Sequence, residues 1–257
     1  MSKSKLSIAG LSVLAAGTLA VCAYALTPQQ AGQAGAVVVT PSTKAVSSPS
    51  ASAPAPPKLK LPANPSVLIV GDSYTEGTGA GKEEDRWASV AAGLLNLNPR
   101  IDGVGGTGFA WGGGKANDQG QQFIVRIRKI ADEKIISPDA VVIQGGQNDV
   151  LLKNDPAVTR AVVDTVNETK KLWPATQVLI MGPSAPEPNA TKFASTSAAV
   201  RAGAATAGVP YIDADGENWF DQQNSGTYNF DGNHVNTAGH RLIAEKFAEH
   251  WRELTKP

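Results

Sequence analysis

Short apolar runs alternate with amphipathic segments along the chain beyond residue 65. The runs at 67–70, 101–104, 140–143, 177–181 and 209–212 are rich in β-branched residues and predict strands. Apolar residues at helical spacing predict helices over 86–97, 121–131, 157–172, 190–207 and 238–251. Strands that alternate with helices predict an α/β fold, a three-layer α/β/α sandwich with a mostly parallel sheet.

The first 64 residues lack this pattern and divide into two parts. In residues 1–26, Lys3 and Lys5 precede an uncharged apolar stretch, and Ala23-Tyr24-Ala25 suits signal peptidase. This predicts a signal peptide or a retained N-terminal membrane anchor, with lipidation of Cys22 as a third alternative. Residues 27–64 are rich in Ala, Pro and Ser, which predicts a disordered linker before a folded domain at 65–257.

All three interpretations of the amino terminus place the folded domain outside the cytoplasm. It would be secreted or tethered to the outer face of the membrane or cell wall, and association with the cell envelope follows from the retained anchor and from the lipidated cysteine.

The chain has 23 basic and 23 acidic residues, a balance that gives no indication of a nucleic-acid partner. Its single cysteine excludes an internal disulfide and a cysteine-based zinc site. We expect a monomer with no cofactor and no metal.

Four polar motifs follow predicted strands or precede the last predicted helix. Right-handed crossovers would bring the carboxyl ends of parallel strands to one edge of the sheet, where such folds bind their ligands. The motifs are Gly71-Asp72-Ser73, the glycine-rich loop 103–108, Gly145-Gly146-Gln147-Asn148-Asp149 and Asp231-Gly232-Asn233-His234.

These motifs contain what acyl transfer requires, namely a nucleophile, a base, a group that orients the base, and donors to the oxyanion. Ser73 supplies a hydroxyl and His234 an imidazole, and Asp231 lies one turn before that histidine. Gly106 offers a backbone N–H and Asn148 a side-chain N–H. Asp149 is interpreted as a structural acceptor, and Trp111 as a pocket residue because it shares a loop with Gly106.

Together the motifs resemble those of the SGNH, or GDSL-type, serine hydrolase superfamily, in the same order along the chain. Tyr74 stands where that motif has its leucine, and Gly106 is assigned from the spacing Gly103-x-x-Gly106. The resemblance implies a flavodoxin-like sheet and an esterase. In it, Ser73 is the nucleophile, His234 the base and Asp231 its partner. The oxyanion hole would comprise Ser73, Gly106 and Asn148.

Other interpretations remain open. Residues 103–108 also match a dinucleotide-binding loop, but no helix opens directly after them, which argues against it. The same site would serve an O-acyltransferase acting on cell-envelope glycans, and a non-catalytic wall-binding module is a third interpretation. The substrate is expected to be a small-molecule, glycan or lipid ester, with a short acyl group favoured. His240 and His250 are interpreted as packing or surface residues.

Overall fold

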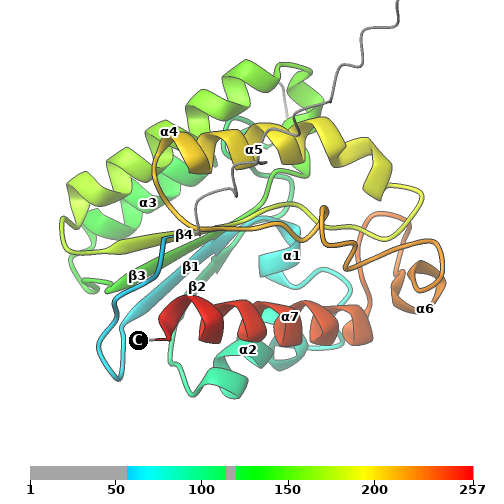
Figure 1. Cartoon of the computed structure of the whole chain (residues 1–257), viewed down its shortest axis with the longest axis horizontal. Helices are drawn as coiled ribbons and strands as arrows, with labels where there is room; N and C mark the ends of the chain where they lie inside the picture. Colours follow the sequence, from blue (N-terminus) through cyan, green and yellow to red (C-terminus); the bar gives the residue numbers. More distant parts are fainter. Residues whose placement is uncertain (1–56, 114–119, 257) are drawn as a thin grey trace, which may run out of the picture. The chain divides into compact units, whose positions relative to one another are not determined.

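A five-stranded parallel sheet forms the middle layer of the folded part of the protein. The computed structural model describes residues 57–113 and 120–256 (Figure 1). The strands are β1 (Val67–Gly71), β2 (Arg100–Gly103), β3 (Ala140–Gln144), β4 (Gln177–Met181) and β5 (Tyr211–Ile212). Their order is β2-β1-β3-β4-β5, with every neighbouring pair parallel. This is the flavodoxin-like strand order, and the predicted fold class is confirmed.

Helices cover both faces of the sheet (Figure 1). One face carries α2 (Trp87–Leu95) and α7 (Thr237–Thr255), and the other carries α3 (Phe123–Asp132), α4 (Asp155–Leu172) and α5 (Ala194–Thr206). Successive strand residues point to opposite faces. In β1, therefore, Ile69 belongs to the core cluster that contains Phe247 of α7, and Val70 to the one that contains Phe123 of α3.

Five short helical turns lie in the connections, and four of them were not predicted. They are α1 (Ser73–Glu76), η1 (Glu83–Asp85), η2 (Asn148–Leu152), η3 (Ala190–Phe193) and α6 (Ser225–Tyr228). The helix predicted over 190–207 is in fact η3 followed by α5. Three of these turns, α1, η2 and η3, contribute residues to the cleft described below.

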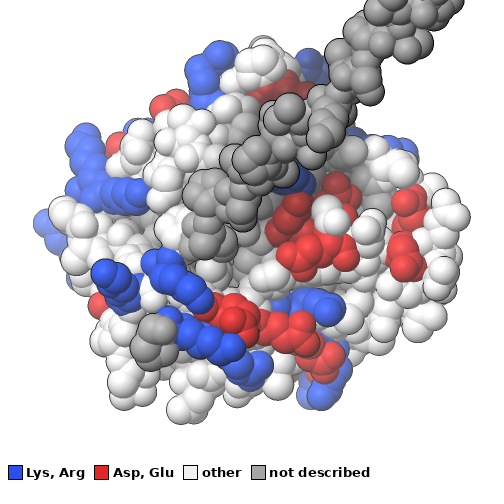
Figure 2. Space-filling view, in the orientation of Figure 1, with Lys and Arg blue, Asp and Glu red and all other residues white. Residues whose placement is uncertain are grey.

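The outer surface of α7 is solvated and carries charges of both signs. Arg241 pairs with Glu245, and Lys246 pairs with Glu249, at helical spacing. Figure 2 shows basic and acidic side chains beside one another along this helix. Such pairs contribute little to stability, and this side of α7 is a solvent-facing one.

The predicted boundary between linker and domain needs correction. Leu59 is only 4% exposed and belongs to the core cluster beneath α2 and α7. Its N–H donates to the carbonyl of Leu254 at 2.8 Å, and the Lys60 N–H donates to Gln177 Oε1 at 2.8 Å. The predicted linker 27–64 therefore ends earlier, because Leu59 and, in part, Leu61 pack on the core of the domain.

The predicted signal or anchor segment and the linker up to residue 56 lie outside the described residues. Within residues 57–113 and 120–256, no helix has the length and apolar character needed to cross a membrane.

Candidate active site

Ser73 lies just past the carboxyl end of β1, at the first position of α1. Asp72 caps this helical turn, since its Oδ1 accepts the Tyr74 N–H at 3.0 Å. Gly77 closes the turn with φ +105°, and its N–H donates to the carbonyl of Ser73. The side chain of Ser73 is thus fixed at the edge of the sheet by a strand before it and a capped turn after it.

A chain of hydrogen bonds joins Ser73 to the segment before α7. Ser73 Oγ lies 2.9 Å from His234 Nε2, and His234 Nδ1 lies 2.8 Å from Asp231 Oδ2. With the ring proton on Nδ1, the imidazole donates to the carboxylate and Nε2 is an acceptor for the serine hydroxyl. The structure therefore brings together the three residues that the motifs predict as nucleophile, base and orienting group.

Asp231 holds His234 through its backbone as well as its ring. The second carboxylate oxygen, Oδ1, accepts the N–H of Asn233 at 2.9 Å and the N–H of His234 at 2.8 Å. Burial would raise the pKa of Asp231, but the hydrogen bonds from the His234 ring and from these two N–H groups outweigh it and lower the pKa. The carboxylate is therefore ionised at neutral pH and orients the imidazole.

Two further side chains brace the loop that carries His234, and neither was predicted. The Tyr74 hydroxyl donates to the carbonyl of Asn233 at 2.7 Å, and its ring centroid lies 5.7 Å from that of His234. Asn189 donates to Asn233 Oδ1 at 2.7 Å and to the carbonyl of Gly232. These bonds connect α1 and the segment before η3 to the histidine loop.

Asn148 and Gly106 lie in loops that meet beside Ser73. Asn148 begins η2, separated from the end of β3 by three residues, and its Nδ2 donates to the carbonyl of Thr107 at 2.9 Å. The amide has a second N–H, which this bond leaves for another acceptor. Asn148 lines the same cleft as Ser73 and His234.

The loop around Gly106 reaches the serine. A Cβ atom added at Gly105 would lie 3.7 Å from Ser73 Cβ, and Gly106 itself has φ +74°, a conformation that favours glycine. Among the described residues, no acceptor takes the N–H of Gly106 or that of Ser73. The structure thus leaves two backbone donors and one amide donor near the serine hydroxyl.

Asp149 holds the glycine-rich loop in place. Its carboxylate accepts the N–H groups of Phe109, Ala110 and Trp111 at 2.7 to 3.0 Å. Burial raises the pKa of Asp149, although these three bonds oppose that effect. The interpretation of Asp149 as a structural acceptor is confirmed. Trp111 is buried and does not line the cleft that contains Ser73, contrary to the expectation.

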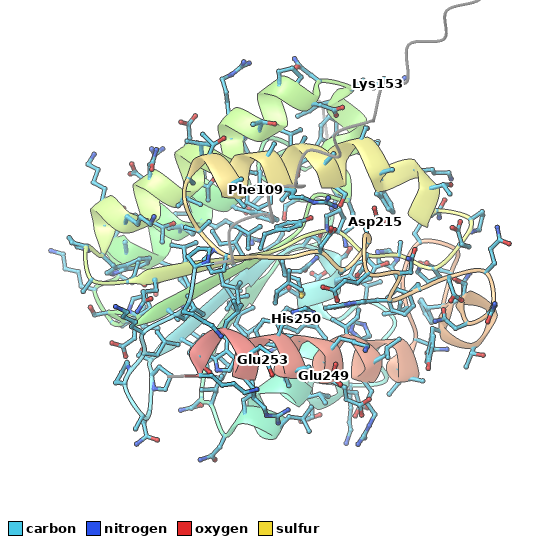
Figure 3. All side chains as sticks on the ribbon, in the orientation of Figure 1. Phe109, Lys153, Asp215, Glu249, His250 and Glu253 are labelled. Atoms are coloured by element: carbon cyan, nitrogen blue, oxygen red, sulfur yellow. The ribbon has the colours of Figure 1, made fainter. Side chains whose placement is uncertain are left out.

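The two other histidines lie away from this arrangement. His240 is fully buried; its Nδ1 accepts the Trp87 N–H at 3.3 Å and its Nε2 lies 3.0 Å from the carbonyl of Thr78. His250 lies on α7, where Figure 3 shows it near Glu249 and Glu253, and its Nε2 is 2.8 Å from Glu217 Oε2. This helix covers the face of the sheet opposite to the core that contains Phe109 (Figure 3). Within the described ranges, no group of three His, Cys, Asp or Glu side chains is arranged to hold a metal ion.

The cleft over Ser73 has a volume of about 530 Å³. Its walls combine apolar and polar side chains from α1, η2, η3 and the histidine loop. The apolar ones are Val150, Leu151 and Phe193 beside Tyr74, and the polar ones include Gln147, Asn189, Lys192 and Asn233. A cleft of this kind can hold an ester with its carbonyl carbon close to Ser73 Oγ.

Comparison with known proteins identifies the family. The GDSL-like lipase/acylhydrolase family matches residues 69–242, a span that contains all four motifs. The chain belongs to this family. A protein of Mycobacterium tuberculosis named GDSL lipase Rv0518 is 27% identical over 193 residues, which are 71% of this chain and 79% of that protein.

Solved structures share the fold at lower identity. An active-site mutant of a family two carbohydrate esterase from Clostridium thermocellum is 16% identical, with a TM-score of 0.58 over 77% of this chain and 64% of that one. A carbohydrate acetylesterase family member from Sinorhizobium meliloti is 19% identical, with a TM-score of 0.50 over 74% of this chain and 98% of that one. These structures show the shared fold, whereas the family match identifies the protein as a hydrolase of the GDSL-like lipase/acylhydrolase family.

Proposed function

We propose that the protein is an exported serine esterase that hydrolyses short-acyl carboxylic esters through an acyl-enzyme on Ser73. The observation that carries this proposal is the 2.9 Å contact between Ser73 Oγ and His234 Nε2, continued at 2.8 Å to Asp231. A serine hydroxyl at its ordinary pKa is a weak nucleophile, and a base within hydrogen-bond reach activates it.

In the first half of the reaction, Ser73 Oγ attacks the ester carbonyl carbon while His234 Nε2 takes the hydroxyl proton. The new bond places negative charge on the former carbonyl oxygen. The N–H groups of Ser73 and Gly106 and the Asn148 amide are the donors that would stabilise it. His234 then gives its proton to the departing alcohol oxygen, and the carbonyl re-forms as an acyl-serine.

Water completes the second half by the same route. His234 takes a proton from water as the oxygen attacks the acyl carbon, and the proton passes to Ser73 Oγ when the acid leaves. Asp231 stays ionised throughout and stabilises the imidazolium that forms in each half. No step requires a metal ion or an organic cofactor, so activity should persist in EDTA.

Two observations support a short acyl group on the substrate. The cleft is bounded by side chains of short turns, η2 and η3, and its apolar wall comprises a few residues. Two solved structures that share the fold have names that describe a carbohydrate esterase and a carbohydrate acetylesterase family member. A series of 4-nitrophenyl esters from acetate to palmitate tests this part of the proposal, and the highest kcat/KM is expected at acetate to butyrate.

Ser73→Ala tests the proposal itself. Loss of the nucleophile should lower kcat by at least about a thousandfold, as removal of one member of such a triad does. The variant should keep the wild-type melting temperature, because the hydroxyl contacts only His234 among the described residues. Labelling by a fluorophosphonate should occur in the wild type and be absent in the variant. A Ser73→Ala protein with wild-type turnover would refute the mechanism.

Export is the second part of the proposal, and the sequence of residues 1–26 supports it. The protein would then act as a monomer, secreted or associated with the cell envelope through its amino terminus, on an ester substrate and without a nucleic-acid partner. Fractionation of cells that express the full chain, with mass measurement of the mature amino terminus, distinguishes cleavage, retention and lipidation of Cys22. Recovery of the intact chain in the cytoplasm would refute export.

A further inference from the structure

The charge on the cleft wall indicates what kind of ester the site accepts. Of the described residues that line the cleft, Lys192 is the one lysine or arginine, and none carries a carboxylate. Lys192 is exposed at the cleft edge and makes no ion pair with a described residue. An unpaired ammonium in a cleft without carboxylates attracts an anionic ligand.

A buried side chain fixes the position of this ammonium. Lys192 Nζ donates to Asn189 Oδ1, and Asn189 is only 6% exposed. The amide of Asn189 in turn donates to Asn233 Oδ1 at 2.7 Å, next to His234 in the chain. A lysine on a solvated surface would sample many rotamers, whereas this one is connected to the histidine loop through two asparagines.

This connection places Lys192 on the leaving-group side of Ser73. His234 protonates the departing alcohol oxygen, so the alcohol half of the ester lies toward the histidine loop. Asn148, one of the three proposed donors to the oxyanion, begins η2, which also contributes Val150 and Leu151 to the cleft. The acyl half therefore faces the apolar residues of η2, and the alcohol half faces Lys192.

We propose that Lys192 is a specificity-determining residue that selects esters whose alcohol half carries an anionic group, a carboxylate or a phosphate. The inference rests on the proposed esterase function and specifies its substrate class. In this proposal Lys192 binds the substrate and does not contact the reacting atoms. Because the site is open to solvent, the discrimination that Lys192 provides between substrates depends on ionic strength.

Matched acetyl esters test this assignment in the full-length protein. The set is 4-acetoxybenzoate and 4-acetoxyphenyl phosphate, with an anion on the alcohol half, and 4-acetoxybenzamide as the neutral reference. The measured quantity is the ratio of kcat/KM for each anionic ester to that for the neutral one. Lys192→Met should lower this ratio by about three- to fivefold and Lys192→Glu by about tenfold, the range for a solvent-exposed ion pair and its reversal. The ester with the larger loss identifies the preferred anion.

Three controls separate charge recognition from a structural effect. Lys192→Arg should keep the wild-type ratio. Lys171→Met removes an equal charge from the exposed surface of α4, outside the cleft, and should also leave the ratio unchanged. Addition of 0.5 M NaCl should lower the ratio in the wild type and have little effect in Lys192→Met.

Two results would overturn the inference. One is an equal fall in kcat/KM for all three esters in Lys192→Met, which would make Lys192 a structural residue. The other concerns the ratio of kcat/KM for mono-4-nitrophenyl succinate to that for 4-nitrophenyl butyrate. If Lys192→Met lowers this ratio more than it lowers the ratios for the esters with an anion on the alcohol half, the anion belongs on the acyl half. A wild-type protein that hydrolyses none of these esters would instead refute the proposed function.

Discussion

At the scale of single residues, hydrogen bonds hold the side chains over the sheet edge in place. Asp231 uses one oxygen for the His234 ring and the other for the backbone of the same loop. Asn148 donates to the carbonyl of Thr107 with one N–H and has a second available. Fixed donors and acceptors of this kind need no rearrangement as charge develops in a transition state.

Asn148→Ala tests whether Asn148 belongs to the oxyanion hole. An amide that donates to the tetrahedral oxyanion binds most strongly in the transition state, so its removal should lower kcat and leave KM little changed. The expected loss is about a hundred- to a thousandfold. Because the same side chain donates to Thr107, the melting temperature should also fall by a few degrees. Steady-state kinetics and a thermal melt on one preparation measure both effects.

Asn154→Ala is the matched control for this variant. Asn154 caps the amino terminus of α4, where its side chain accepts the N–H of Ala157, and it lies outside the cleft. Its replacement should lower the melting temperature and leave kcat unchanged. Asn148→Asp should be less active than Asn148→Ala, because it places a carboxylate against the developing negative charge. Full activity in a destabilised Asn148→Ala protein would remove Asn148 from the proposed site.

The residues found by motif and those found by structure differ in how they act. Ser73, His234 and Asp231 could be predicted because their chemistry requires particular residue types at particular places along the chain. Tyr74, Asn189 and Lys192 could not. Their roles depend on contacts between segments far apart in sequence, such as the bond from Tyr74 to Asn233. Such contacts exist only after the parallel strands have aligned their carboxyl ends.

At the scale of elements, the site depends on how β1 passes into α1. Gly71 ends the strand, and a Cβ atom there would lie 2.1 Å from Thr75 Oγ1. The Arg126 side chain donates to the carbonyl of Gly71 at 2.8 Å and to that of Asp102 at 3.2 Å, so α3 fastens the ends of β1 and β2. These contacts fix the turn that carries Ser73.

Asp72 within this turn makes stability depend on pH. It is fully buried, its Oδ2 has no hydrogen-bond partner among the described residues, and burial raises its pKa to about 7. The unfolded chain ionises Asp72 near pH 4, whereas the folded protein keeps the proton until about pH 7. The folded state therefore binds more protons between these values, and stability falls as pH rises from about 4 to about 7.

Asp72→Asn tests this conclusion. The amide oxygen still accepts the Tyr74 N–H and the side chain no longer titrates. The difference in melting temperature, variant minus wild type, should become more positive between pH 4 and 7 and then stay constant. Melts at pH 4.5, 6 and 8 measure it, with Asp155→Asn, at the half-buried first position of α4, as the control. A difference that does not change with pH would show that Asp72 does not titrate in this range.

The strands show why some elements could be predicted and others not. The run at 140–143 is apolar throughout because β3 is covered on both faces, and its assignment is confirmed. The run at 209–212 gives only Tyr211 and Ile212 as β5, since Pro210 has no N–H for the ladder. The one-turn helices α1 and α6 span four residues each, too few for a helical period to be recognised.

At the scale of the whole molecule, the ends of the described chain meet at the edge of the sheet opposite the site. The segment around Leu59 pairs with Leu254 near the end of α7 and with Gln177 at the start of β4. Ser73 lies at the carboxyl end of β1, across the sheet from these contacts. In the sequence, only the alternation Lys58-Leu59-Lys60-Leu61 indicates that the segment around Leu59 belongs to the domain. The proline-rich stretch just before this alternation obscures that pattern.

Leu59→Ala tests whether this segment belongs to the folded unit. Removing a leucine side chain that is 4% exposed should lower the free energy of unfolding by about 2 to 3 kcal/mol, the lower part of the range for buried Leu→Ala changes, because the segment lies at the edge of the core. Activity per folded molecule should not change, since Leu59 lies across the sheet from Ser73. Urea unfolding with parallel ester hydrolysis measures both quantities. Leu94→Ala, at a position that is 41% exposed, is the control and should cost much less.

Chains that begin at residue 57 and at residue 65 extend the test, because the shorter one lacks every contact of this segment. Equal stability of the two chains would return the domain boundary to residue 65.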